Sequence, residues 1–262
     1  MKATDPTRRL RLTIAFDGSA YHGWQAGRSG KGAADQLAAV LEQTLGVKAD
    51  LVSSSRTDSG VHAHALVAHA DVPRHHAKQR PDALVARINA HLPATLRVRA
   101  ARWVSASFDA RFDASAKQYR YQLWNEPVMH PLWQGRAWHV PGALDLKAMR
   151  AATRRLLGTH DFRAFTSRRD GTLGSTRRTI HKLTLKREGP LWTVVIEADG
   201  FLYKMCRAIV GTLVRIGQGR MSLAELGALL KSGSTRTPGV NAPAHGLMLW
   251  SVKYGRKVKG QH

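Results

Sequence analysis

The spacing of the apolar residues predicts the same order of strands and helices in the first and the second half of this chain. Apolar residues that alternate predict strands, whereas apolar residues three or four positions apart predict helices. In the first half these patterns predict strands at 10–16, 51–52, 65–72 and 96–104 and helices at 37–45 and 81–92. The resulting order, β-α-β-β-α-β, is the split βαβ arrangement.

The second half keeps this order without repeating the sequence. It has predicted strands at 119–124, 180–187, 192–198 and 247–252 and helices at 145–157, 201–216 and after Ser222, where a capping box begins. We therefore predict an α/β (α+β) fold of two similar split βαβ, ferredoxin-like domains with antiparallel or mixed sheets. The expected domains are 1–106 and 107–262, joined across a basic cleft.

The chain is strongly basic, with 41 lysine and arginine residues against 18 aspartate and glutamate residues and a formal net charge of +23. Such a charge predicts affinity for nucleic acid, because cations that neutralise phosphates release condensed counterions. A ribosome-like or nonspecific RNA binder is the plain alternative. No apolar run is long enough to span a bilayer, the first residues lack the apolar core of a signal peptide, and Cys206 is the single cysteine. We expect a cytoplasmic protein without a membrane partner or a disulfide.

One acidic residue is conspicuous within residues 53–63, SSSRTDSGVHA. Asp58 lies between Arg56 and a Ser-Gly turn, on a surface that should attract phosphate. Aspartate is common in turns, so a turn residue is one interpretation. A glycosidase or a two-metal nuclease needs a second carboxylate close by. A single nucleophilic carboxylate beside a cation, which favours the ionised form, fits the loop better.

Other stretches offer weaker signals. His62 and His64 are spaced as a possible metal pair, but no third ligand is evident, and we expect no metal and a hydrogen-bonding role for His62. Residues 27–32, GRSGKG, fail the P-loop pattern and predict a mobile basic loop. Residues 166–182 are either a solvated linker or a phosphate clamp. The side chains that we expect on an RNA backbone are Arg28, Lys31, Arg168, Arg169, Arg177 and Arg178.

Residues 56–63, RTDSGVHA, closely resemble the catalytic loop of the tRNA pseudouridine synthase A (TruA) family. The resemblance covers nearly the whole chain through further blocks in the expected order. These blocks are FDG at 16–18, YHGWQ at 21–25, NAHLP at 89–93, FDARF at 108–112, GTHDF at 158–162, GFL at 200–202, MCR at 205–207 and APAHGL at 242–247.

The resemblance implies an isomerase that converts uridine to pseudouridine at positions 38–40 of the tRNA anticodon arm, without a cofactor. Asp58 matches the family's nucleophile, which adds either to the ribose or to the base. Arg56 matches an arginine that fills the space left by a flipped base. Tyr119 matches a tyrosine that stacks on the target base, although a core strand tyrosine is the alternative. Arg207 matches the arginine that pairs with the nucleophile.

Thr57, Gly60 and His62 would support the loop, and the family implies a homodimer that positions tRNA across its subunits. The sequence departs from the family where Ser55 replaces a glycine, where Cys206 replaces a valine, and at 27–34. On composition alone, a noncatalytic RNA-binding or chaperone protein and a metal-dependent nuclease remain the competing classes.

Overall fold

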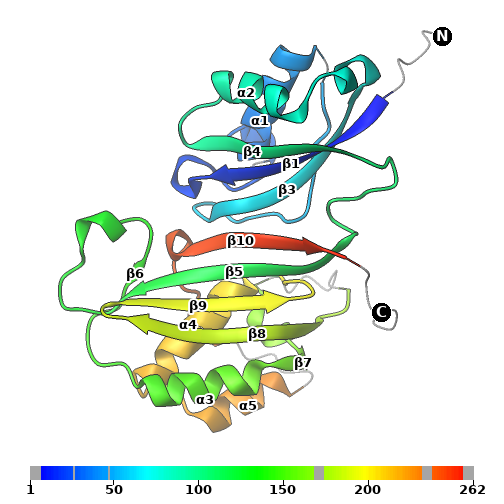
Figure 1. Ribbon diagram of the computed structural model, residues 1–262. Coiled ribbons are helices and arrows are strands. Elements are labelled where there is room, and N and C mark those ends of the chain that lie inside the picture. Colours follow the sequence, from blue (N-terminus) through cyan, green and yellow to red (C-terminus); the bar gives the residue numbers. More distant parts are fainter. Residues whose placement is uncertain (1–6, 26, 47, 168–173, 232–237, 256–262) are drawn as a thin grey trace. The chain divides into compact units, whose positions relative to one another are not determined.

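Two compact units make up the part of the chain that the computed structural model describes, which is residues 7–25, 27–46, 48–167, 174–231 and 238–255 (Figure 1). The first unit comprises Met1–Ser115 and Leu249–His262, and the second comprises Ala116–Met248. The chain therefore leaves the first unit, builds the second, and returns to the first with its last strand. The domains 1–106 and 107–262 and the basic cleft stay predictions.

The first unit has the predicted β-α-β-β-α-β order. Its elements are β1 (Thr7–Phe16), α1 (Ala33–Leu45), β2 (Val52–Ser53), β3 (His62–Pro73), α2 (Pro81–His91) and β4 (Leu96–Val104). Strand β1 pairs antiparallel with β3 on one side and β4 on the other, and β2 pairs with β3. Strand β10 (Leu247–Tyr254) lies beside β3 and enters this unit at Leu249.

The core of the first unit lies on the side of the sheet that α1 and α2 cover (Figure 1). Leu10, Leu12 and Ile14 alternate along β1 and are fully buried. Arg11 and Thr13 come between them and therefore lie on the opposite face. This alternation gives β1 an apolar face towards the helices and a basic face on the other side of the sheet.

The second unit contains the remaining elements. They are β5 (Ala114–Trp124), β6 (Trp138–His139), α3 (Leu146–Leu156), β7 (Gly158–Asp161), β8 (Arg177–Glu188), β9 (Leu191–Ala198), α4 (Met205–Gly217) and α5 (Leu223–Leu230). The strand order is β5-β9-β8-β7 with antiparallel pairs, and β6 pairs parallel with β5. Helix α3 contacts α4, α5 and β8. The predicted α/β class with a mixed sheet is confirmed.

Some predicted boundaries in the second unit are wrong. The helix expected from residue 201 begins at Met205, because Lys204 has φ = +61° and cannot belong to a right-handed helix. The capping box at Ser222 is confirmed: its hydroxyl accepts from the Glu225 N–H at 3.2 Å, and the Glu225 carboxylate accepts from the Ser222 N–H at 2.7 Å. Among the described residues, every helix is too short or too polar to cross a bilayer.

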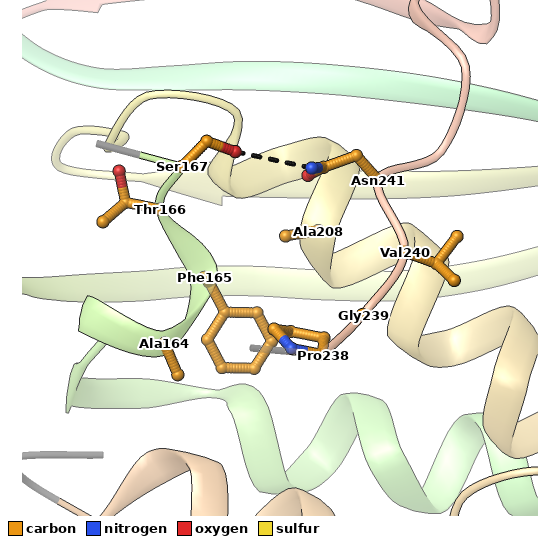
Figure 2. Close-up of a pocket in the computed structure, with 9 residues that line it drawn as sticks. All are labelled: Ala164, Phe165, Thr166, Ser167, Ala208, Pro238, Gly239, Val240 and Asn241. Atoms are coloured by element: carbon orange, nitrogen blue, oxygen red, sulfur yellow. Dashed lines mark hydrogen bonds between the residues drawn. The ribbon is translucent and has the colours of Figure 1, made fainter. Parts of the chain in front are cut away.

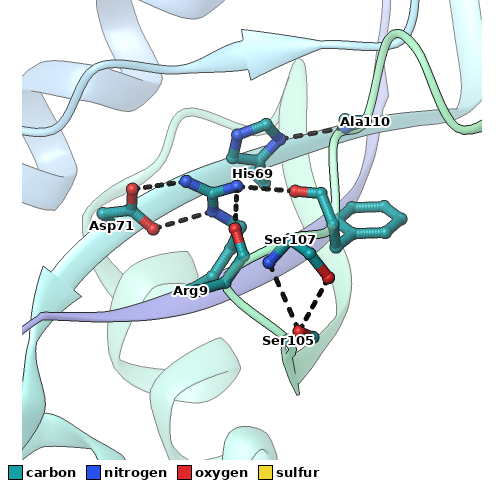
Figure 3. Close-up of polar contacts among 8 residues, drawn as sticks. Arg9, His69, Asp71, Ser105, Ser107 and Ala110 are labelled. Atoms are coloured by element: carbon teal, nitrogen blue, oxygen red, sulfur yellow. Dashed lines mark hydrogen bonds and ion pairs between the residues drawn. The ribbon is translucent and has the colours of Figure 1, made fainter.

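The segment after β4 is fixed to the first unit by Arg9 (Figure 3). Arg9 Nε and Nη2 donate to the two carboxylate oxygens of Asp71 at 2.8 and 2.6 Å, while Nη1 donates to the carbonyls of Ala106 and Phe108 at 2.6 and 2.7 Å. The hydrogen bonds from Arg9 lower the pKa of Asp71 below its usual value. Bidentate pairing of this kind fixes geometry as well as charge.

His69 on β3 fixes the same segment through a neutral ring. Its Nδ1 accepts a hydrogen bond from the Ala110 N–H at 3.0 Å, so this nitrogen carries no proton while the bond is made. Burial lowers the pKa of His69, and the positive charge of Arg9 lowers it further.

We expect the free energy of unfolding to fall as the pH drops below about 6.5, because the unfolded chain then binds a proton at His69 that the folded chain does not bind. Above that pH neither state binds the proton. The thermal unfolding midpoint should therefore decrease between about pH 7.5 and about pH 5.5. The decrease should be smaller in His69→Asn, whose amide oxygen replaces Nδ1 as the acceptor and does not titrate. Equal decreases in both proteins would contradict this role for His69.

Candidate active site

Asp58 lies in the first unit, in the loop that joins β2 to β3. The N–H of Val61 donates to the carbonyl of Asp58 at 3.1 Å and closes a four-residue turn. Gly60, the third residue of that turn, has φ = +80°, as a type II turn requires. Asp58 is partly exposed and Arg56 is exposed. The turn therefore holds the backbone of Asp58 while leaving the residue partly exposed.

Thr57 anchors the loop to the segment that precedes α1. The N–H of Trp24 lies 3.1 Å from Thr57 Oγ1 and 3.3 Å from the Thr57 carbonyl, and both accept from it. Gly23, with φ = +85°, packs against the same backbone: a Cβ there would overlap the Thr57 carbonyl oxygen and lie 3.1 Å from the carbonyl carbon of Asp58. Only glycine fits at position 23 without moving the loop.

The other end of the loop is held in the same way by the segment after β1. His62 Nδ1 accepts from the Gly18 N–H at 3.1 Å and lies 3.2 Å from Asp17 Oδ1. A Cβ at Gly18 would overlap the carbonyl oxygen of Val61. His62 therefore joins the loop to an earlier segment of the chain. Two glycine contacts, one on each side of Asp58, fix the loop from outside.

Ser55, at the position where the resemblance implies a glycine, adds a polar atom to this loop. Its hydroxyl is buried and has no hydrogen-bond partner among the described residues. Its carbonyl accepts from the Ser53 hydroxyl at 3.1 Å. A buried hydroxyl without a partner lowers stability. The side chain of Ser55 therefore does not stabilise the loop as the side chain of a cap or turn residue would.

Tyr119 lies in the second unit, on β5 opposite Ile196 of β9. It is 7% exposed, and its ring meets Phe201 edge to face with centroids 5.0 Å apart. Tyr121, two residues on, is fully buried and donates to the Pro243 carbonyl at 2.8 Å. Burial raises the pKa of Tyr121 far above its ordinary value, an effect that the charge of Arg207 opposes. Tyr121 is thus a structural tyrosine with a satisfied hydroxyl.

Three residues of α4, each four positions apart, hold the segment that leads towards β10. Arg207 Nε donates to the Ala242 carbonyl at 2.7 Å, and the Ala242 N–H donates to the Arg207 carbonyl at 3.0 Å. Arg215 Nη1 donates to the Pro238 carbonyl at 2.6 Å. Gly211 lies between them, where a Cβ would overlap the backbone of the same segment. One face of the helix therefore fixes both Arg207 and this segment.

An open pocket of about 130 Å³ lies between this segment and the residues after β7 (Figure 2). Asn241 Nδ2 donates to Ser167 Oγ at 3.4 Å across the two sides. The remaining lining residues are mainly apolar or small: Ala164, Phe165, Thr166, Ala208, Pro238, Gly239 and Val240.

The cationic side chains that are predicted to contact the RNA backbone are spread over both units. Lys31 is exposed before α1, and Arg177 is exposed at the start of β8. Arg178 is half-buried, and its Nη1 donates to the Ser175 and Arg177 carbonyls at 2.8 and 2.6 Å. Arg168, Arg169 and the side chain of Arg28 lie outside the described residues. Across the described ranges, no three His, Cys, Asp or Glu side chains converge as metal ligands would.

The residues that hold the proposed reactive residues in place were not predicted from the sequence. The contacts of Gly18 and Gly23 join segments far apart in the chain, so local patterns do not reveal them. A signal for the α4 face was present, since Arg207, Gly211 and Arg215 interrupt an apolar helix at intervals of four.

Comparison with known proteins points to one family. A family model described as tRNA pseudouridine synthase matches residues 152–255. A tRNA pseudouridine synthase A of Methylacidiphilum infernorum is 40% identical over 250 residues, covering 93% of this chain and 94% of the relative. Proteins of the same name from a Bradyrhizobium species and from Syntrophotalea carbinolica are 39% and 40% identical, covering 94% of this chain and 99% and 96% of the relatives.

A crystal structure of a Cbf5-Nop10-Gar1 complex resembles the chain only distantly. The match has a TM-score of 0.36 and 12% identity and covers 78% of this chain and 45% of that chain. A likeness this low supports no argument.

Proposed function

The chain belongs to the tRNA pseudouridine synthase A family, an isomerase family acting on tRNA, and on that premise we propose that it converts uridine to pseudouridine at positions 38–40 of the anticodon arm. In this isomerisation the bond from ribose C1′ to uracil N1 is replaced by one to uracil C5. The C5 proton is lost and N1 gains one, so the reaction consumes no oxidant or cofactor.

Asp58 is the proposed nucleophile, adding either to ribose C1′ or to the base. The strongest support is the setting of its loop. The turn at Gly60, the Trp24–Thr57 hydrogen bonds and the two glycine contacts fix the backbone around Asp58 before any substrate binds. Holding a reacting group in place beforehand removes much of the entropic cost of the reaction.

Tyr119, Arg207 and Arg56 are the proposed substrate-binding residues. The aromatic face of Tyr119 would hold the uracil ring while it turns, as aromatic side chains hold bases splayed out of RNA. Arg207 would pair with the Asp58 carboxylate through a charge-assisted hydrogen bond, and its bond to the Ala242 carbonyl uses Nε. Exposed Arg56 would fill the gap that the flipped nucleotide leaves in the RNA stack.

The remaining expectations complete the proposal. Lys31, Arg177, Arg178, Arg28, Arg168 and Arg169 would contact phosphates, and their support is the net charge of +23. The homodimer is proposed from the family resemblance alone, and the cytoplasmic location is proposed from the composition of the chain.

Incubating unmodified tRNAs with the protein and mapping pseudouridine nucleotide by nucleotide tests the function. We expect modification at positions 38–40 wherever these are uridines. A protein that binds these tRNAs but forms no pseudouridine would instead be the noncatalytic RNA binder. RNA cleavage that needs magnesium or zinc would indicate a nuclease.

Replacing Arg207 by alanine should lower kcat by about tenfold, because a charge-assisted hydrogen bond of roughly 1.5 kcal/mol to the nucleophile is lost. Single-turnover conversion of tRNA measures this. Arg215→Ala is the matched control: it also removes a bond from α4 to the 238–242 segment, at Pro238, but not the proposed partner of Asp58. Equal losses of kcat in the two variants would show that Arg207 acts only by holding the segment.

A further inference from the structure

Two β-bulges lie at the same level on either side of β1. The pairing of β1 with β3 shifts between Ile14 and Phe16, and its pairing with β4 shifts between Thr13 and Ile14. The extra residue on β4 is Arg99, and the shift on β3 includes His64. Bulges redirect side chains and are frequent next to active sites. His64 follows the Asp58 loop directly along the chain.

The two bulges bring their side chains together. Arg99 Nη1 lies 3.0 Å from His64 Nε2, within hydrogen-bond distance across β1. The His64 ring stacks on Trp250 of β10, with centroids 4.2 Å apart and planes 9° from parallel. Arg99 is exposed, and the two rings are half-buried. A cation and two parallel aromatic rings therefore form one cluster on the first unit.

Like charges face each other on the same sheet. Arg11 of β1 and Arg102 of β4 are directly opposite in the antiparallel register. Arg11 lies on the face of the sheet away from the helices, and its guanidinium is 4.6 Å from the Tyr254 ring centroid. Directly opposed like charges destabilise a sheet. Among the described residues, no carboxylate pairs with Arg11, Arg99 or Arg102.

We propose that these five residues, Arg11, Arg99, Arg102, His64 and Trp250, form a binding surface for the RNA substrate outside the reacting nucleotide. We call this surface the arginine face. Phosphates would neutralise the opposed arginines, which accounts for a charge arrangement that weakens the sheet on its own. A nucleobase would stack on the His64–Trp250 rings, as bases stack on aromatic residues in RNA-binding sheets. The assignment of tRNA as the ligand rests on the proposed function.

Filter binding of an anticodon stem-loop RNA at several salt concentrations tests the arginine face. The double variant Arg99→Ala/Arg102→Ala should raise Kd about tenfold and reduce the salt slope by roughly one to two, because up to two phosphate contacts are lost. The control is Arg74→Ala/Arg154→Ala, which removes two exposed arginines from elsewhere and the same charge. The control should change Kd and slope much less.

Trp250 tests the stacking part separately. Trp250→Ala should weaken binding by about fivefold or more, whereas Trp250→Phe, which keeps an aromatic face, should restore most of the affinity. Thermal unfolding of each variant shows whether the first unit remains folded. If Trp250→Phe binds as weakly as Trp250→Ala although both are folded, stacking on this ring is refuted.

Pseudouridine formation by the same proteins distinguishes failure of this inference from failure of the proposed function. The arginine variants should have a raised KM and a wild-type kcat, because the face binds RNA away from the reacting bond. If the wild type forms pseudouridine but the double variant matches its control in Kd, slope and KM, the arginine face is refuted and the function stands. If no pseudouridine forms but the double variant loses affinity and slope relative to its control, the face stands as an RNA-binding surface.

Discussion

Replacing Asp58 by asparagine should lower kcat for pseudouridine formation by about 10⁴-fold or more, the scale on which enzymes lose activity with their nucleophile. The amide has nearly the same shape as the carboxylate, so the turn closed by Val61 and Gly60 should persist. It lacks the charge needed to attack C1′ or the base. Binding of tRNA should remain or become tighter, because a negative charge is removed. Single-turnover conversion and filter binding on the same preparation measure both.

The matched control for this substitution is Asp50→Asn. Asp50 is also an aspartate of the first unit, precedes β2 and is exposed. It should convert tRNA at the wild-type rate. Undiminished pseudouridine formation by a folded Asp58→Asn protein would refute Asp58 as the nucleophile.

Replacing Gly23 by alanine should lower kcat by about 10²-fold, because the added Cβ overlaps the Thr57 carbonyl and must push the Asp58 backbone away. The same substitution should lower the free energy of unfolding by about 1–3 kcal/mol, since φ = +85° is a conformation that alanine adopts only with strain. Thermal unfolding and single-turnover conversion, measured together, separate these two effects.

Gly46→Ala is the control for backbone strain alone. Gly46 ends α1 with φ = +69°, and a Cβ there would meet nothing within 4 Å. It should lose about 1 kcal/mol of stability and keep its kcat. If Gly23→Ala also keeps its kcat, the close contact between Gly23 and the loop has no catalytic importance.

The elements that the sequence predicted well are those with a long, regular apolar period. Leu10, Leu12 and Ile14 of β1 share the covered face and alternate with residues of the uncovered face, and this spacing requires a strand. Strands β6 and β7 are too short to show a period and were not predicted. The predicted start of α4 was wrong because the apolar pattern already includes Leu202, whereas the left-handed backbone at Lys204 prevents the helix from beginning before that residue.

The sequence proposes the reactive residues of the candidate site but does not predict what supports them. Asp58 is proposed from its motif and from its contrast with a basic chain. Gly23 and Gly18 lie in recognisable blocks, yet nothing local says that each touches the Asp58 loop. Such contacts depend on which distant segments meet, and that is decided by packing of the whole unit.

The return of the last strand to the first unit has a consequence for how the chain acquires its fold during synthesis. The ribosome completes residues up to Ser115 long before it adds Leu249 and those after it. Until then the Ala110 carbonyl lacks the Tyr254 hydroxyl that donates to it at 2.8 Å, and His64 lacks the indole of Trp250. The second unit is thus an insertion within the first. The unit that carries Asp58 can finish folding only after translation of the inserted unit is complete.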